Sequence, residues 1–493
     1  LSVTSAVLLL LICGILWAFR ARSISTTSQQ TIAVLPFENL SSDSDNEYLC
    51  FGVMDEVTTD LAKDRNLRVI ARTSAAHFKR GDSIASIGQK LKATAILEGS
   101  ISKRGDHVRI TAQLINVADA VHLWAETYER EGEDPLSIQN EVSREIARAV
   151  STRLGGAESA ELPKVQYSRD AEANRLYWKG AYFHSIIGST NWKENVQRST
   201  KYFEQSIERD PQFAAAYGAL ADAYATLAIQ SGGSPETALL MRKARKAATK
   251  ALALDGTLSG AYGVLATVQF SYDYDAASAE KNFTRGLELN PNDARAHMWY
   301  AMALAPQARF QECLSHAEQA RELDPLSFAT SNQLAALTYL SRDYEKAAKI
   351  ARETLEIDPG LAPPHILLGM TYEAKQEYVK AIDEYETGLR IAPDHQFGIG
   401  RFGHALGEAN RRDELRKVVA RVETERATSR FSDLYAAYIY LGLNDLDRVF
   451  ELLEGAYQHH DPDLPYVAVD PIFDPVRTDP RYKSLVKKLG LTN

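Results

Sequence analysis

Histidine and carboxylate side chains, which often bind transition metals, stand together at His459, His460, Asp461 and Asp463. Two adjacent histidines point in different directions, and no second pair of ligands follows at the spacing of a helical turn. We therefore interpret these four residues as a solvated connection and predict no metal site.

Other local patterns also fall short of a known chemistry. The glycine pattern from Gly81 to Gly88-Gln89-Lys90 has a six-residue gap and lacks the final Ser or Thr of a phosphate-binding loop. The acidic loop 43–47 lacks the glycine and the final glutamate of a calcium loop. Arg-Gly-Asp occurs at 80–82 and 104–106, where Gly-Asp is ordinary turn chemistry. No Ser, Cys or His carries the local signature of a nucleophilic enzyme, so we predict no catalytic residue, no cofactor and no enzyme activity.

The composition is that of a globular protein with more than one domain. The chain has 493 residues, of which 45% are hydrophobic and 25% are charged. Its net charge of −9 argues against a broad nucleic-acid-binding face, so we expect no nucleic-acid partner within these residues. Cys13, Cys50 and Cys313 stand far apart, which leaves no disulfide framework and no zinc ribbon.

The first nineteen residues, Leu1–Phe19, carry no charge and would form about 28 Å of helix, just enough to span a bilayer. Trp17 near the end of this run, followed by Arg20 and Arg22, is typical of a membrane interface. We expect residues 1–22 to be a transmembrane anchor with the lipid bilayer as a partner. A cleaved signal peptide is the alternative, but no basic residue precedes the apolar run. The two arginines favour a cytoplasmic soluble body.

After a spacer at residues 23–30, β-type and helical patterns alternate through a domain at 31–155. The predicted elements are a strand at 31–37, a helix at 47–63, a strand at 67–71, a helix at 83–91, strands at 95–101, 108–115 and 122–128, and a closing helix at 135–154. This order predicts a small α/β domain.

Five sequence blocks follow one another along this domain: Ile32-Ala-Val-Leu-Pro-Phe-Glu-Asn-Leu40, Val69-Ile-Ala-Arg-Thr-Ser74, Leu97-Glu-Gly-Ser100, Val108-Arg-Ile-Thr-Ala-Gln-Leu114 and His122-Leu-Trp-Ala-Glu-Thr-Tyr128. Together they resemble the TolB-type amino-terminal domain. The resemblance implies a small α/β module that pairs with other protein segments, and it does not imply an active site. It also implies a periplasmic soluble body, whereas Arg20 and Arg22 indicate a cytoplasmic one. The family's founding protein continues into a β-propeller, whereas helical repeats follow here, so the propeller function is not implied.

A dipeptide of Asp or Asn followed by Pro recurs in the C-terminal part of the chain, which indicates repeats. Four prolines, at positions 291, 325, 359 and 393, are evenly spaced. Their interval equals the period of tetratricopeptide-type helical hairpins, in which proline ends the second helix of each unit. In the unit 360–393, small residues stand where two helices cross and large residues stand beside them, as in the tetratricopeptide signature. These residues are Leu368, Gly369, Tyr372, Ala381, Tyr385 and Gly388.

We expect a linker at 156–167, about eight hairpins at 168–457 and a capping segment at 458–493. The predicted fold class is therefore an α/β TolB-like domain plus an all-α tetratricopeptide superhelical solenoid, with one N-terminal transmembrane helix. The first helices of such an array line its concave side, the usual surface for a protein or peptide partner. By register, the residues that should face this groove are Arg295, Met298, Asn332, Tyr339 and Glu373.

Three interpretations of function stay open. The first is a membrane-anchored interaction scaffold or sensor, single-pass in the bacterial inner membrane, with self-association into a homo-oligomer undecided. In the second, the order of anchor, TolB-like domain and repeats resembles the membrane-anchored half of CadC-type winged-helix regulators and related cyclase proteins. That resemblance implies an output domain upstream of Leu1. The third, an enzyme with an unfamiliar site in the α/β domain, would need clustered ionisable residues in a cleft.

Overall fold

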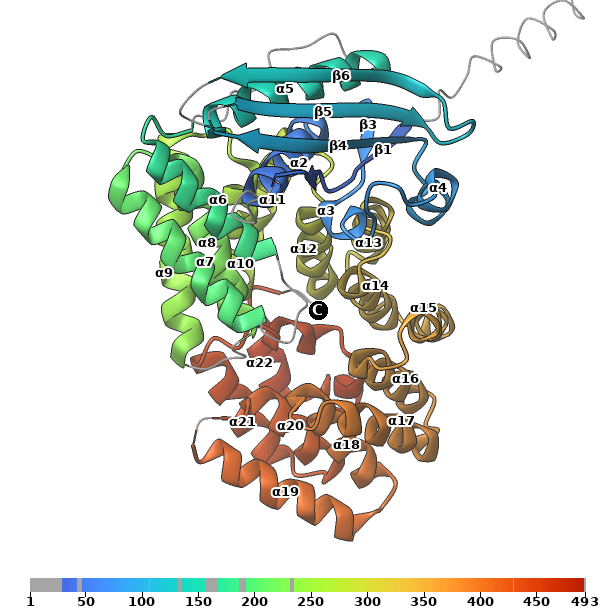
Figure 1. The fold of residues 1–493 in the computed structure, drawn as a ribbon. Helices are drawn as coiled ribbons and strands as arrows, with labels where there is room; N and C mark the ends of the chain where they lie inside the picture. Colours follow the sequence, from blue (N-terminus) through green and yellow to red (C-terminus); the bar gives the residue numbers. More distant parts are fainter. Residues whose placement is uncertain are drawn as a thin grey trace, which may run out of the picture.

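An α/β domain lies against one side of a curved array of helical hairpins in the computed structural model (Figure 1). The structure describes residues 29–41, 47–105, 107–131, 135–155, 167–185, 192–230, 235–428 and 430–491. Within these ranges it is a mostly helical, tetratricopeptide-like solenoid with a sheet region toward the N-terminus.

A mixed sheet forms the centre of the α/β domain. Its strands lie in the order β3-β1-β4-β5-β6, and β2 pairs with β4 beside this path. β1 is parallel to β3 and to β4, whereas β4, β5 and β6 are antiparallel neighbours. The strands are β1 (Gln30–Val34), β2 (Glu38–Asn39), β3 (Leu67–Val69), β4 (Ala95–Arg104), β5 (His107–Asn116) and β6 (His122–Glu131).

Helices cover both faces of this sheet because β1 is apolar on both sides. Ile32 and Val34 pack against α2 (Glu47–Ala62) and α5 (Pro135–Arg153), and the alternate residues Ala33 and Leu35 pack on the side of α4 (Ile84–Leu91). The short helix α3 (Arg72–Ala75) follows β3. The alternation of strands and helices predicted from the sequence is present, but β2 and α3 were missed.

The helices from α6 to α21 form eight hairpins in chain order. Their bounds are α6 (Ala171–Ser185), α7 (Trp192–Arg209), α8 (Ala214–Gln230), α9 (Pro235–Leu254), α10 (Ser259–Ser271), α11 (Ala276–Leu289), α12 (Ala294–Leu304) with the 3-10 turn η2 (Ala305–Gln307), α13 (Phe310–Leu323), α14 (Phe328–Leu340), α15 (Tyr344–Ile357), α16 (Ala362–Ala374), α17 (Tyr378–Ile391), α18 (Gln396–Glu408), α19 (Arg412–Arg426), α20 (Asp433–Gly442) and α21 (Leu446–Gln458).

The repeat period continues in the backbone beyond the last regular proline. A residue with left-handed φ recurs in the turn between the two helices of a hairpin, each time exactly one repeat after the last. These residues are Tyr274, Ala308, Arg342, Gln376, Asn410 and Asn444. Between hairpins, Asp210 and Asp358 each accept a hydrogen bond of 2.9 Å from the N–H two residues on, a turn that explains the Asp before Pro.

The crossing of α16 and α17 has the close approach that the tetratricopeptide signature predicts. A Cβ on Gly369 would lie 2.5 Å from Cε1 of Tyr385, a residue that is fully buried. A Cβ on Gly388 would lie 2.8 Å from Cδ1 of Ile366. Side chains at these positions would force the two helices apart.

The C-terminal segment, residues 459–491, lies inside the curve of the hairpins and not only on the last one (Figure 1). It contains η3 (Leu464–Ala468), η4 (Pro471–Val476) and α22 (Pro480–Lys488). The hydroxyl of Tyr466 donates to the carbonyl of Met302 in α12 at 3.2 Å. Arg342, in the turn after α14, donates to both carboxylate oxygens of Asp474 at 2.7 and 2.8 Å. The segment therefore reaches several repeats back along the array.

The predicted location in the bacterial inner membrane is corrected by this structure. Among the helices of the described ranges, none has the length and apolar character needed to cross a bilayer. The stretch Leu1–Phe19, on which the prediction of a transmembrane helix depended, lies outside the described residues, and so does the linker at 156–166.

Candidate partner-binding region

The five residues predicted to line a groove do not form one open surface. Met298, Tyr339 and Glu373 are buried, with exposed fractions of 3%, 1% and 7%. Arg295 is half-exposed and Asn332 is partly buried. The structure brings Tyr339 and Glu373 together around a third residue.

That third residue is Arg401 of α18, whose side chain is 1% exposed. Its guanidinium donates to Glu373 at 3.3 Å and to Asp470 of the C-terminal segment. The guanidinium carbon lies 5.8 Å from the centre of the Tyr339 ring and 5.0 Å from that of Tyr438, a cation–π arrangement. Arg401 thus joins α14, α16 and α20 to the C-terminal segment.

The charges of this cluster compensate one another. Burial lowers the pKa of Arg401, but the charges of Asp470 and Glu373 outweigh burial and the pKa is raised. Burial raises the pKa of Glu373, but His404 and Arg401 outweigh it and the pKa is lowered. Arg401 and Glu373 are therefore both charged inside the protein. Through Arg401, the buried Tyr339 of α14 and Glu373 of α16 are joined here to the chain's own C-terminal segment.

Arg295 makes a second contact between repeats. Its guanidinium donates to Asp222 of α8 at 2.8 Å, and Asp222 also lies 3.4 Å from Nε2 of His184. Burial lowers the pKa of His184 to about 4, although the charge of Asp222 raises it in part. Met298 belongs to the main core. Among the described residues, the side-chain oxygen of Asn332 has no hydrogen-bond partner. Whether any of these residues contacts a partner stays a prediction.

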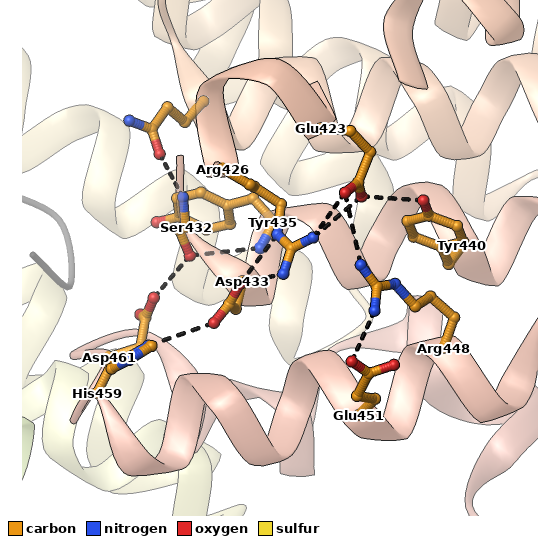
Figure 2. A network of polar contacts seen from close by, with 11 residues as sticks. Glu423, Arg426, Ser432, Asp433, Tyr435, Tyr440, Arg448, Glu451, His459 and Asp461 are labelled. Atoms are coloured by element: carbon orange, nitrogen blue, oxygen red, sulfur yellow. Dashed lines mark hydrogen bonds and ion pairs between the residues drawn. The ribbon is translucent and has the colours of Figure 1, made fainter. Parts of the chain in front are cut away.

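Asp461, at the start of the C-terminal segment, belongs to a polar network (Figure 2). Asp461 accepts a hydrogen bond of 2.7 Å from the hydroxyl of Ser432, and Asp463 accepts one from Tyr435. Burial raises the pKa of Asp461 to about 7, with a further increase from the charge of Asp463. This pair fixes the point where the chain leaves α21 and turns into the array.

The neighbouring histidines contact other groups. Nδ1 of His459 lies 3.3 Å from Asp433, and the ring of His460 stacks on that of Tyr272 with 4.4 Å between centres. Within the described part of the chain, no three potential ligands are arranged to hold a metal ion.

The array also holds the α/β domain, and it does so through the turns between hairpins. The amide nitrogen of Asn292, between α11 and α12, donates to the carbonyls of Ala62 and Leu67 at 3.0 and 3.1 Å. Its amide oxygen accepts from the N–H of Val69 at 3.1 Å. Leu67 and Val69 are the first and last residues of β3, which lies at one edge of the sheet. The Asn292 side chain therefore pairs with backbone groups on the open side of this strand.

The turn between the next two hairpins makes a second attachment. The hydroxyl of Ser74 donates to Asp324 at 2.5 Å and accepts from the N–H of Leu326 at 2.9 Å. The N–H of Ala71 donates to the carbonyl of Leu323 at 2.7 Å. Ser74 is fully buried and Asp324 is 7% exposed, so this contact is part of the folded interior. Two successive inter-repeat turns therefore carry the domain.

The same edge of the array is uncovered further along. Leu323, at the end of α13, is 2% exposed, whereas Ile357 at the end of α15 is 81% exposed and Ile391 at the end of α17 is 42% exposed. These three residues occupy the same position in three successive repeats. At the position where Leu323 is covered, the next two repeats therefore expose an aliphatic side chain.

Sequence reasoning missed the residues that make these contacts. Arg401 had a signal, because it is a lone charge in the small and apolar run Gly398-Ile-Gly-Arg-Phe-Gly403. Asp470 and Asn292 had none, because Asp and Asn beside Pro are read as turn residues wherever they occur.

Comparisons with known proteins find similarity to transcriptional regulators and to a putative cyclase. The model of a family described as the second domain of HilA/YgeH-like transcriptional regulators matches residues 28–146. The putative adenylate cyclase 3 of Rhizobium meliloti (strain 1021) is 33% identical over 194 residues, which are 39% of this chain and 32% of that protein. The transcriptional regulator HilA of Salmonella typhimurium (strain LT2) is 22% identical over 370 residues, 73% of this chain and 64% of HilA.

This chain contains tetratricopeptide-like repeats and is similar to a transcriptional regulator. It spans about a third of the cyclase and less than two thirds of HilA. The crystal structure of yeast Tom70 has 16% identity and a TM-score of 0.41, covering 68% of this chain and 70% of Tom70. The assignments to the TolB type and to CadC-type regulators are not confirmed, and the absence of enzyme activity stays a prediction.

Proposed function

We propose that this chain is the protein-binding, sensory part of a regulator, in which the α/β domain and the repeats act as one unit. The observation that carries the proposal is the attachment of a folded domain to two successive inter-repeat turns, at Asn292 and Asp324. An array that holds one domain by its turns offers the same kind of support further along. The match to HilA is longer than residues 168–493, so it includes part of the α/β domain as well as repeats.

The proposed contact for a partner protein is the uncovered continuation of this edge, at Ile357 and Ile391. Burying a side chain of this type contributes roughly 1.5–3 kcal/mol relative to leaving it exposed. The inside of the curve is the less suitable surface, because the C-terminal segment packs there through residues such as Leu464 and Phe473, which are fully buried.

Photo-crosslinking tests this proposal in cells that make the protein. A photoreactive residue at position 357 should capture one protein, and the added substitution Ile391→Arg should prevent the capture. The matched control is Val379→Arg in the first turn of α17, where Val379 is 73% exposed but lies at the other end of that helix. Equal capture in the two arginine variants would contradict a binding edge at Ile357 and Ile391.

The output of the regulator is proposed to lie outside these residues. HilA favours transcription control and the cyclase relative favours a nucleotide cyclase, and this chain spans only part of each. Reading the gene on the 5′ side of the codon for Leu1 tests this. The expected result is an in-frame DNA-binding or cyclase domain. A stop codon directly before Leu1 would leave a protein-binding scaffold without its own output.

A further inference from the structure

The two edges of the sheet differ in how they are covered. The β3 edge is closed by Asn292 and by the carbonyl of Leu323. At the other edge, β6 pairs with β5 along one side, and no strand in the described ranges pairs with its outer side. β6 has ten residues and lies at the rim of the molecule (Figure 1). A long open edge presents a row of N–H and C=O groups to another strand.

β6 also lacks two of the residues that often prevent edge pairing. Its sequence, His-Leu-Trp-Ala-Glu-Thr-Tyr-Glu-Arg-Glu, has neither proline nor lysine. The irregularity in its pairing with β5 falls between Leu114 and Ile115, opposite the first residues of β6, so the rest of the strand is regular. Val121 and Leu123 at its start are 53% and 44% exposed. Such an edge is suited to strand addition.

We propose that the occupant of this edge is the β6 strand of a second copy of the chain, antiparallel to the first and related to it by a two-fold axis. Such an axis lies perpendicular to the joined sheet, so a residue and its symmetry copy project from the same face. Residues directly opposite each other in antiparallel strands also share a face, and neighbours along a strand do not. One residue of β6 must therefore lie opposite its own copy. This leaves a small number of registers to compare.

The register centred on Thr127 fits the side chains of β6. Thr127 would lie opposite Thr127 of the partner subunit, and its hydroxyl already lies 3.3 Å from that of Thr111 on β5. The pairing would extend these two threonines into a row of four across the joined sheet. Cross-strand threonine pairs are favourable.

The same register opposes no two like charges. Trp124 would face Arg130 of the partner subunit, and Glu126 would face Tyr128 of the partner subunit. Ala125 and Leu123 would face the two remaining glutamates, Glu129 and Glu131. A register centred on Glu126 would instead place two carboxylates directly opposite each other, which is destabilising. Arg130 is also fixed in place, since it donates to Glu141 and Glu145 of α5 at 3.1 Å each.

Disulfide crosslinking of the full chain tests the pairing and its register. Thr127→Cys should give a covalent dimer under mild oxidation, because residue 127 faces itself across the axis. Ala125→Cys should not, because its counterpart lies four residues along the strand, about 13 Å away. Both positions are exposed on the same face, so both variants should fold. Wild type shows the background from Cys13, Cys50 and Cys313.

Charge substitution gives a second readout by light scattering. Thr127→Lys would oppose two lysines and should weaken self-association about tenfold or more. Ala125→Lys would face Glu129 of the partner subunit and should leave self-association unchanged or stronger. A monomeric wild type at every concentration, or crosslinking of Ala125→Cys as efficient as that of Thr127→Cys, would overturn the proposal. Neither result would affect partner binding at Ile357 and Ile391.

Discussion

Substitution of Asn292 by alanine should loosen the α/β domain from the repeats. Its side chain pairs with the carbonyls of Ala62 and Leu67 and with the N–H of Val69, at 3.0 to 3.1 Å. Leu67 and Val69 are fully or almost fully buried, so their backbone groups would lose their partners without gaining free access to water. A buried group without a partner costs about 1–3 kcal/mol, and partial rehydration offsets some of that. Since three groups lose a partner, we expect a loss of about 2–4 kcal/mol in the attachment.

Hydrogen exchange followed by mass spectrometry measures this loss where it occurs. The amide of Val69 should exchange about 30- to 700-fold faster in Asn292→Ala, since each 1.4 kcal/mol is a factor of ten. The matched control is Asp394→Ala. Asp394 occupies the same position three repeats later, where its side chain is 96% exposed and pairs with Arg421 at 2.9 Å. An exposed pair of this kind contributes about 0–1 kcal/mol. Unchanged exchange at Val69 in Asn292→Ala would refute the attachment through this side chain.

Three further predictions concern the repeats and the C-terminal segment. Gly369→Ala should lower the midpoint of thermal unfolding, because overpacking against Tyr385 costs about 1–3 kcal/mol. The control Gly263→Ala in α10, where a Cβ meets nothing within 4 Å, should raise this midpoint. Shifts in the same direction would contradict the helix crossing. Arg401→Met should destabilise the protein by about 3–5 kcal/mol in urea, because the buried Asp470 loses its guanidinium partner and Glu373 keeps His404 and Tyr385 but loses the guanidinium. A neutral effect would contradict the paired charges. The raised pKa of Asp461 favours the protonated carboxyl in the folded state, so its contribution to the free energy of unfolding is complete below about pH 4 and is lost as the pH rises through about 7. The urea midpoint should therefore fall over this pH range, and it should fall less in Asp461→Asn. An equal fall in both proteins would contradict the raised pKa of Asp461.

The fold was more predictable from the sequence than the contacts inside it. Each junction between repeats needs a residue such as Asp210 or Asp358 for the turn and a proline to end the helix. These residue types therefore recur in the sequence at the repeat period. The strands of the α/β domain show in the same local way. β2 and α3, with two and four residues, are too short to show a period.

The predicted groove depended on a different kind of information. Helical register placed Tyr339 and Glu373 in a groove, and the structure buries both side chains. Register alone does not say what fills the inside of a curve. The C-terminal segment fills it, and Asp470 of that segment pairs with Arg401. Asp470 is 69 residues away from Arg401 in the chain, and no local pattern marks this contact. Long-range ion pairs of this type depend on the final curvature of the whole array, which no local pattern contains.

The C-terminal segment also bears on how a partner signal could cross the array. It contacts α12 through Tyr466 and α18 through Arg401, so it ties together repeats that are far apart along the solenoid. A repeat array without such a tie changes its curvature by small adjustments between neighbours. Here a change at Ile357 or Ile391 would need to break a buried ion pair or move both tied regions together. A partner proposed to bind this edge would shift the array only if it binds one of two arrangements of the array more tightly.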